Sequence, residues 1–233
     1  MNFEDFIKIE EKILLLNHSD LIKYIFDNYS NIAFSSSFGA EDQVLTDMIL
    51  KVDKNSRVFT LDTGRLHKET YEVMDATNLK YGVKIEVLFP NYKDIEKLYI
   101  SQGINGHYES IENRKNCCNI RKIEPLKRAL KDVDIWITGL RASQSVTRTN
   151  MPIIEWDDNF KIIKLNPLIN WSEDDVWDYI KTNKVPYNKL HDSGYPSIGC
   201  EPCTRAIKDG EDIRAGRWWW EDPNHKECGL HKK

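Results

Sequence analysis

The feature that most constrains the fold is the alternation of short apolar runs with amphipathic segments between residues 31 and 165. Strand-like runs occupy 31–35, 57–61, 84–88 and 135–138, and helical patterns lie between them at 41–50, around 69–74, at 92–101 and at 120–130. Strands that alternate with helices form a parallel sheet with helices on both faces. The sequence therefore predicts an α/β fold, and ligands of such folds bind beyond the carboxyl ends of the strands.

The regions before and after this alternating segment have other sequence patterns. Residues 3–29 have apolar spacing typical of helices, 153–165 resemble a β-hairpin, and Ser172 is placed to cap another helix. From about residue 185 the chain is rich in Gly, Pro and charge and is expected to be irregular, with a mobile end. No linker or repeat interrupts it, so we expect a single domain, 1–233, with parts at 1–30, 31–185 and 186–233.

Composition excludes several classes of protein. Hydrophobic residues make up 40% and charged residues 30%, which is globular, and the net charge of −4 disfavours a broad nucleic-acid surface. The longest apolar run, 13–16, is far shorter than the roughly 18 residues of a membrane span, and the acidic N-terminus does not resemble a signal peptide. We expect a cytoplasmic protein without a nucleic-acid or membrane partner, in which disulfides are rare.

Two polar loops follow neighbouring strands. Ser35, Ser36 and Ser37 begin the run SSSFGAED at 35–42, and Leu61 and Asp62 begin LDTGR at 61–65. Small residues and hydroxyls at a helix N-terminus suit an anion, although each loop alone is equally a turn with a helix cap. The first loop is not a Walker A motif. Together, the two loops predict a nucleotide site at one edge of the sheet.

The five cysteines form a pattern of their own: Cys117 and Cys118 are adjacent, Cys200 and Cys203 form C-x-x-C, and Cys228 stands alone. Four thiolates in two pairs suit zinc or an iron–sulfur cluster. The alternative without a metal is four buried free thiols, since cysteine is often buried. Adjacent cysteines turn toward one ion with difficulty, whereas a cubane offers each a separate iron, which favours a [4Fe-4S] cluster. Cys228 is either an unused surface thiol or a thiol that a flexible tail brings to a site.

Basic residues cluster near these motifs. They are Arg121, Lys122, Arg141, Arg148, Arg205, Arg214 and Arg217. A single arginine usually belongs to a solvated face, but several beside the motif loops suit a polyanion, because guanidinium groups match phosphate and sulfate. The run 218–220 of three tryptophans is either core or a partner surface.

Taken together, these motifs resemble the assimilatory adenylylsulfate reductases, relatives of the phosphoadenylylsulfate reductases. The matching segments are SSSFGAED at 35–42, LDTGRLHKETY at 61–71, CCNIRKIEPL at 117–126, GLRASQSVTR at 139–148, NPLINWSEDDVWDYI at 166–180, GCEPCTR at 199–205, RAGRWWWE at 214–221 and ECGLH at 227–231. The resemblance implies the adenine nucleotide alpha hydrolase-like, or PP-loop, fold. Residues 31–185 would then be the nucleotide-binding core, and 186–233 the cluster-binding segment and mobile catalytic tail.

The resemblance also implies an activity. Adenosine 5′-phosphosulfate (APS) would be reduced to sulfite and AMP, with thioredoxin or glutaredoxin as electron donor and an S-sulfocysteine intermediate on Cys228. The phosphosulfate side would be served by Lys122, Arg141, Arg148, Arg214, Arg217 and His231, of which Lys122 and His231 join Cys228 as catalytic residues. The other substrate-binding positions are Ser35, Ser36, Ser37, Leu61, Asp62 and Gly139, and the ligands of a [4Fe-4S] cluster are Cys117, Cys118, Cys200 and Cys203. We expect the cluster to act through its charge and by placing Lys122.

Three alternatives stay open. In the family that this chain resembles, reductases specific for PAPS, the 3′-phosphorylated form of APS, generally lack the four cysteines and tend to have a tyrosine where this chain has Arg65, which favours APS. Arg65 could still serve the extra phosphate, so a PAPS or bispecific reductase is the runner-up. An ATP-dependent PP-loop ligase is disfavoured by the absence of an SGGxDS-like loop, and a metal-stapled binding module is the non-enzymatic alternative. The sequence allows a homo-oligomer without predicting one.

Overall fold

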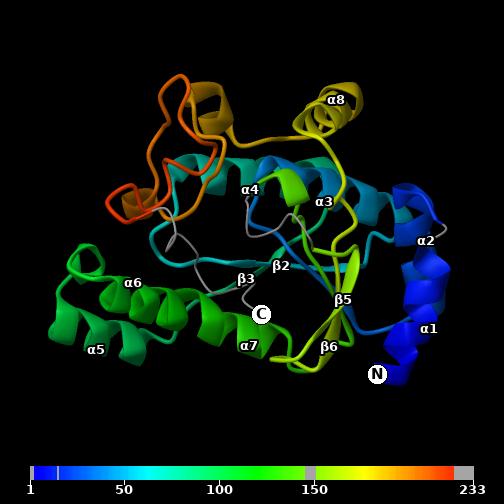
Figure 1. Ribbon diagram of the computed structural model, residues 1–233, viewed down its shortest axis with the longest axis horizontal. Helices are drawn as coiled ribbons and strands as arrows, with labels where there is room; N and C mark the ends of the chain where they lie inside the picture. Colours follow the sequence, from blue (N-terminus) through cyan, green and yellow to red (C-terminus); the bar gives the residue numbers. More distant parts are fainter. Residues whose placement is uncertain (1–2, 15, 145–150, 223–233) are drawn as a thin grey trace.

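A sheet of six strands forms the centre of the computed structural model, which describes residues 3–14, 16–144 and 151–222 (Figure 1). The strands are β1 (Ile32–Ser35), β2 (Arg57–Leu61), β3 (Glu86–Leu88), β4 (Ile135–Ile137), β5 (Ile154–Asp157) and β6 (Ile162–Leu165), in the spatial order β3-β2-β1-β4-β6-β5. All neighbouring pairs are parallel except β5 with β6, which form the expected antiparallel hairpin at one edge.

Side chains on alternate strand positions enter two separate cores. Phe34, Ile135 and Ile137 belong to the larger core, whereas Ala33 and Trp136 belong to a smaller one on the opposite face. This period-2 alternation explains why the central strands are mainly apolar, since both of their faces are buried.

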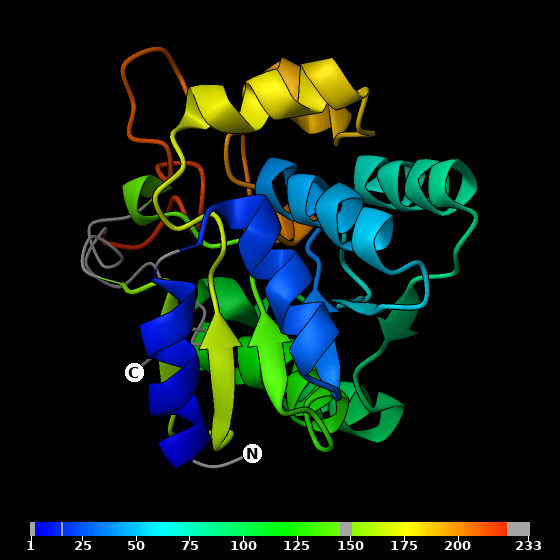
Figure 2. The same cartoon turned by 90° about the vertical axis from the view of Figure 1, so that its right-hand side faces the viewer.

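Helices cover both faces, as predicted. The helices α1 (Phe3–Ile13), α2 (His18–Asn28), α3 (Ala40–Val52), α4 (Lys68–Tyr81) and α8 (Glu173–Asn183) contribute to the larger core. On the other side of the sheet lie α5 (Tyr92–Gln102), α6 (Ile111–Cys118) and α7 (Glu124–Ala129), as Figure 1 shows. In the view of Figure 2, α1 and α2 lie alongside β6, β5 and β4, so the N-terminal helices pack onto the same core as the sheet.

The helix predicted at 120–130 is longer and more complex than its apolar spacing suggests. It begins as α6, capped by Ser110, whose side chain accepts a hydrogen bond from the Asn113 N–H, and passes through a π-helical turn (Asn119–Ile123) into α7. The sequence of α6 shows no apolar stripe because the helix buries Arg114 and Cys118 instead. π-Helical turns occur frequently at functional sites.

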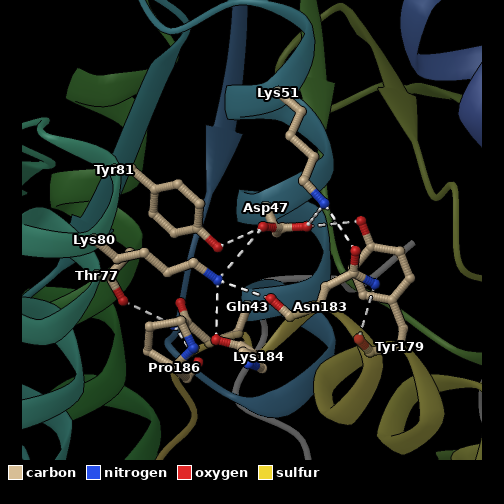
Figure 3. Close-up of polar contacts among 10 residues, drawn as sticks. All are labelled: Gln43, Asp47, Lys51, Thr77, Lys80, Tyr81, Tyr179, Asn183, Lys184 and Pro186. Atoms are coloured by element: carbon tan, nitrogen blue, oxygen red, sulfur yellow. Dashed lines mark hydrogen bonds and ion pairs between the residues drawn. The ribbon is translucent and has the colours of Figure 1, made fainter.

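A polar network fixes the chain after α8. Asp47 of α3 is buried and accepts hydrogen bonds from the hydroxyls of Tyr81 (2.7 Å) and Tyr179 (2.8 Å) (Figure 3). It also forms an ion pair with Lys51 (2.6 Å). The Lys80 ammonium donates to the carbonyls of Asn183 (3.1 Å) and Lys184 (2.9 Å), which end α8. The network therefore ties α8 to α3 and α4 and directs the following segment toward the carboxyl ends of the strands.

That segment is irregular, as expected, apart from the short 3-10 turns Lys189–Ser193 and Glu201–Cys203. Within the described part of the chain, none of the helices has the length and apolarity needed to cross a membrane.

Candidate functional site

A cavity opens beyond the carboxyl ends of β1, β2 and β4, where the sequence predicts the ligand site. The last residues of these strands and the loops that follow contribute Ser35, Ser36, Ser37, Leu61, Thr63, Thr138 and Gly139 to its lining. The cavity includes the boundary between β1 and β4, at which the strand order reverses and where ligands of open α/β sheets bind. We call it the strand-end cavity.

The loop after β1 is held by Asp42, a residue of α3. The backbone N–H and the hydroxyl of Ser37 both donate to Asp42 Oδ2 at 2.6 Å, and the Ser36 N–H donates to the Phe59 carbonyl at 2.8 Å. Burial raises the pKa of Asp42 to about 6, although the hydrogen bonds from Ser37 act in the opposite direction. Gly139 lies so close that an added Cβ would stand 2.0 Å from Asp42 Oδ1, which explains why the position needs glycine.

The loop after β2 is shaped by Asp62. Its Oδ1 accepts from the Gly64 N–H at 2.7 Å and from the Tyr71 hydroxyl at 3.0 Å, and Gly64 has a φ of +70° that favours glycine. Asp62 itself is buried and is absent from the cavity lining, so it braces the turn that presents Leu61 and Thr63.

Three of the predicted cations lie together in this cavity: Lys122, Arg214 and Arg217. The Arg217 Nη1 donates to the Ile198 carbonyl at 3.1 Å and to the Ser197 hydroxyl at 3.3 Å, and its guanidinium lies 4.7 Å from the Trp218 ring. Gly199 leaves room for it, since a Cβ there would lie 2.4 Å from Arg217 Nη2. The cavity thus combines a polar strand-end wall with a cationic wall.

Arg141 is placed differently. Its Nε donates to Glu41 at 2.8 Å, its Nη1 donates to the Ser143 hydroxyl at 2.7 Å, and it lines a second hollow beside α8 instead of the strand-end cavity. Arg148, Cys228 and His231 lie outside the described residues.

The four paired cysteines come together in an adjoining cavity, the cysteine cavity. Cys117 and Cys118 end α6. Cys200 precedes the 3-10 turn Glu201–Cys203 and Cys203 ends it, and a hydrogen bond from the Glu201 N–H to the Arg65 carbonyl (2.8 Å) holds this turn to the β2 loop. All but the partly exposed Cys117 are buried. The other residues that line it are Arg65, His107, Arg114, Arg121, Lys122 and Pro202. Lys122 therefore lines both cavities.

Burial favours the protonated form of two of these thiols, Cys117 and Cys203. Desolvation raises the pKa of Cys203 to about 12, and the nearby Cys200 and Cys117 raise it further, while Lys122 and Arg217 lower it. Desolvation also raises the pKa of Cys117, against the influence of Arg121. Thiols whose pKa is raised by burial still lose their protons when a metal group binds them as thiolates.

The donor set fits an iron–sulfur cluster, because four cysteines from two segments line one cavity. Among the described residues, no three His, Cys, Asp or Glu side chains are grouped closely enough to hold one metal ion. Beside the cysteines, Arg121 Nε and Trp218 Nε1 are buried N–H donors that have no hydrogen-bond partner in the described chain. Soft thiolates, buried N–H groups and surrounding cations suit the negatively charged sulfur atoms of a cubane.

Sequence reasoning missed the buried ion pair of Arg114, a residue that lines this cavity. Arg114 donates to Glu221 through Nε (2.9 Å) and Nη2 (2.6 Å), and its guanidinium lies 4.7 Å from the Trp218 ring. The one available signal is spacing, since Arg114 stands one helical turn before Cys117 and Cys118. Within the tryptophan run, Trp218 belongs to the core, while Trp219 is 40% exposed.

Comparisons with known proteins agree with this arrangement. Residues 31–206 match the family model described as "Phosphoadenosine phosphosulfate reductase domain". The chain is 50% identical to the adenosine 5′-phosphosulfate reductase of Allochromatium vinosum over 92% of its own length and 84% of that protein.

Among solved structures, the phosphoadenylyl-sulfate reductase of Candida auris matches with a TM-score of 0.74 and 28% identity, over 89% of this chain and 98% of that one. The FMN adenylyltransferase of Candida glabrata matches with a TM-score of 0.56 and 16% identity, over 87% and 70%, which is a likeness of fold alone. These likenesses confirm the PP-loop type of α/β fold. The chain belongs to the phosphoadenosine phosphosulfate reductase family.

Proposed function

We propose that this chain catalyses the thiol-dependent reduction of APS to sulfite and AMP. The observation on which the proposal rests most is the position of Lys122, whose side chain lines both the strand-end cavity and the cysteine cavity. A cation shared by the two cavities links a nucleotide site to a cysteine site. The names of the relatives, APS reductases at about half identity over most of the chain, support the same substrate.

Substrate binding follows from the two walls of the strand-end cavity. The adenosine part would lie against Ser35, Ser36, Ser37, Leu61 and Gly139, beyond the ends of the strands. Its phosphosulfate would face Lys122, Arg214 and Arg217, because bidentate guanidinium groups match phosphate and sulfate oxygens. Arg148 and His231 are proposed to join these cations, and Arg141 to act on the same side through its contact with Glu41.

The first chemical step would form a covalent intermediate. The Cys228 thiolate attacks the substrate sulfur, an S–S bond forms, the S–O bond to AMP breaks, and AMP leaves with the electron pair of that bond. The cations offset the repulsion between the thiolate and the sulfonate oxygens and stabilise the phosphate that leaves. Cys228 lies ten positions after Trp218, which is on the cavity wall, and ten extended residues span up to about 35 Å.

The second step would release sulfite. A thiolate of reduced thioredoxin or glutaredoxin attacks the Cys228 sulfur, and sulfite leaves with the electron pair of the S–S bond. The second thiol of the donor then resolves the mixed disulfide and restores Cys228, so the donor dithiol supplies two electrons in total. Free thiols on both partners require a reducing compartment, which favours the cytoplasm.

Cys117, Cys118, Cys200 and Cys203 are proposed to hold a [4Fe-4S] cluster. When bound, it would supply negative charge beside Lys122 and fix the two cysteine segments to each other, with no electrons passed to the substrate. Because Lys122 also lines the strand-end cavity, that charge would bear on the cation that faces the phosphosulfate.

The position of Arg65 supports APS over PAPS. Its guanidinium donates to the Ile104 carbonyl (2.9 Å) and to Asn105 Oδ1 (3.1 Å), and it lines the cysteine cavity but not the strand-end cavity. A cation held there lies outside the proposed nucleotide site and would not serve a 3′-phosphate. The runner-up, a PAPS or bispecific reductase, would need another cation.

The proposal is tested by measuring sulfite and AMP from APS and from PAPS, with a reduced thioredoxin as donor. We expect equal amounts of sulfite and AMP from APS, a preference over PAPS of at least about tenfold in kcat/KM, and loss of most activity in Lys122→Met. Lys127→Met is the matched control, since Lys127 is exposed on α7 and pairs with Glu124. Sulfite from neither substrate would overturn the proposal.

A further inference from the structure

His107 is a buried histidine in the wall of the cysteine cavity. It lies in the 3-10 turn Gly106–Tyr108, its side chain lines the cavity with the four cysteines, and only 3% of the residue is exposed. The turn is held in place by a hydrogen bond from Asn113 Nδ2 to the Gly106 carbonyl (3.1 Å) and by the Tyr108 hydroxyl, which donates to the Pro202 carbonyl (2.5 Å). The imidazole is therefore fixed relative to both cysteine pairs.

The contacts of the ring determine where its proton sits. Arg65 Nη1 lies 3.4 Å from His107 Nδ1, and an arginine side chain can only donate, so Nδ1 accepts. Because the buried Nδ1 faces a guanidinium, which has no lone pair to accept a proton, the ring carries no proton on this nitrogen and is neutral. The single proton is therefore on Nε2.

That Nε2–H has no partner within the described chain, although it is buried. A buried N–H left unpaired costs about 1–3 kcal/mol, so an acceptor is expected. The neighbouring Tyr108 and Trp220 rings, at 4.2 Å and 6.0 Å between centroids, surround the imidazole with aromatic surface and not with oxygen acceptors. The cysteine cavity is the remaining direction in which acceptors, namely sulfur atoms, gather.

We infer that His107 supplies a fixed, neutral N–H donor to a sulfur atom of the group held by the four cysteines. The inference rests on the proposed iron–sulfur cluster and adds a residue to its surroundings. Arg65 acts through His107, because its guanidinium holds Nδ1 as the acceptor and so keeps the proton on Nε2. Hydrogen bonds to the sulfur atoms withdraw charge from them, which stabilises the bound group and changes its electronic properties.

The test compares His107→Phe, which keeps an aromatic ring but removes the donor, with His107→Gln, which keeps an N–H donor. The matched control is His67→Phe, because His67 is also buried with an unpartnered Nε2 but does not line the cysteine cavity. Resonance Raman spectra report the iron–sulfur stretching frequencies, and a chelator reports the rate of iron release. Neither readout depends on turnover.

We expect His107→Phe to shift the iron–sulfur(cysteine) modes to higher frequency and to release iron about tenfold faster, the effect of one lost hydrogen bond to a charged acceptor. His107→Gln and His67→Phe should stay near wild type. Identical spectra and release rates in His107→Phe and wild type would overturn the inference alone. If His107→Phe assembles no cluster, His107→Gln decides: its assembly supports the donor role, and its failure overturns it. Wild-type protein without iron and sulfide would overturn the proposed cofactor and the inference with it.

Discussion

The buried ion pair between Arg114 and Glu221 gives the most demanding prediction. The two side chains are 1% and 3% exposed, and two hydrogen bonds of 2.9 and 2.6 Å join them across 107 residues of sequence. Glu221→Gln keeps the shape of the side chain but leaves the guanidinium charge buried without its carboxylate. Breaking one side of a buried pair costs about 3–5 kcal/mol.

The magnitude follows from the size of the chain. For domains of 150–250 residues, each kcal/mol lowers the melting temperature by about 2–4 °C, so Glu221→Gln should lower it by about 6–20 °C. The remaining amide hydrogen bond and the Trp218 ring beneath the guanidinium place the result toward the smaller value. Differential scanning fluorimetry of cluster-free protein measures the shift.

A second readout separates local from global effects. Arg114 contacts the cysteine segment, so Glu221→Gln should also expose Cys117 and Cys118 to a thiol reagent, measured in a Cys228→Ser background. The matched control is Glu155→Gln, which breaks the buried Lys164–Glu155 pair (2.9 Å) at the sheet edge and should destabilise without exposing the cysteines. A melting temperature within about one degree of wild type, or equal cysteine exposure in both variants, would refute the reasoning.

Three further predictions concern the loops and pH. Gly139→Ala should displace Asp42, because a Cβ there would stand 2.0 Å from Asp42 Oδ1, and should weaken AMP binding at least tenfold by calorimetry; an unchanged affinity would contradict the account. Asp42 has a raised pKa, so its contribution to stability is present below about pH 4 and should be lost, by about 3 kcal/mol, as pH rises through about 6. Burial would raise the pKa of Asp47, but its hydrogen bonds outweigh burial and lower it, so its contribution to stability is present above about pH 4 and is lost on acidification. Urea unfolding of Asp42→Asn and Asp47→Asn across this pH range should therefore deviate from wild type in opposite directions. Parallel dependences of stability on pH would refute both assignments. Arg65→Met should leave the ratio of kcat/KM for APS and PAPS unchanged within about threefold, and a large shift toward either substrate would place the arginine in the nucleotide site.

Local patterns were sufficient to predict the sheet and the gathering of the cysteines. The strands around Phe34, Phe59 and Trp136 are mainly apolar because both sheet faces are covered, and that signal is readable without any contact information. The pairs Cys117–Cys118 and Cys200–Cys203 are rare enough in sequence that a common site was the natural expectation, and the structure places all four around one cavity.

What sequence could not predict depends on partners far apart in the chain. Arg141 looks like any cation beside a strand end, and its contact with Glu41, 100 residues away, appears only once α3 and β4 are packed together. The helix α6 has no apolar periodicity, because its buried face consists of an arginine and cysteines. Asp42 reads as an ordinary first-turn acid of α3, although it is the acceptor that shapes the Ser37 loop.

The most direct test of the account is the intact mass of the protein after incubation with APS in the absence of any thiol donor. We predict a gain of one SO₃ group per chain in wild type, no gain in Cys228→Ser, and loss of the adduct with release of sulfite when a reduced dithiol protein is added. A gain from PAPS as well would keep the mechanism and make the enzyme bispecific. No gain from either substrate, in protein verified to hold iron and sulfide, would contradict the proposal that Cys228 is the nucleophile.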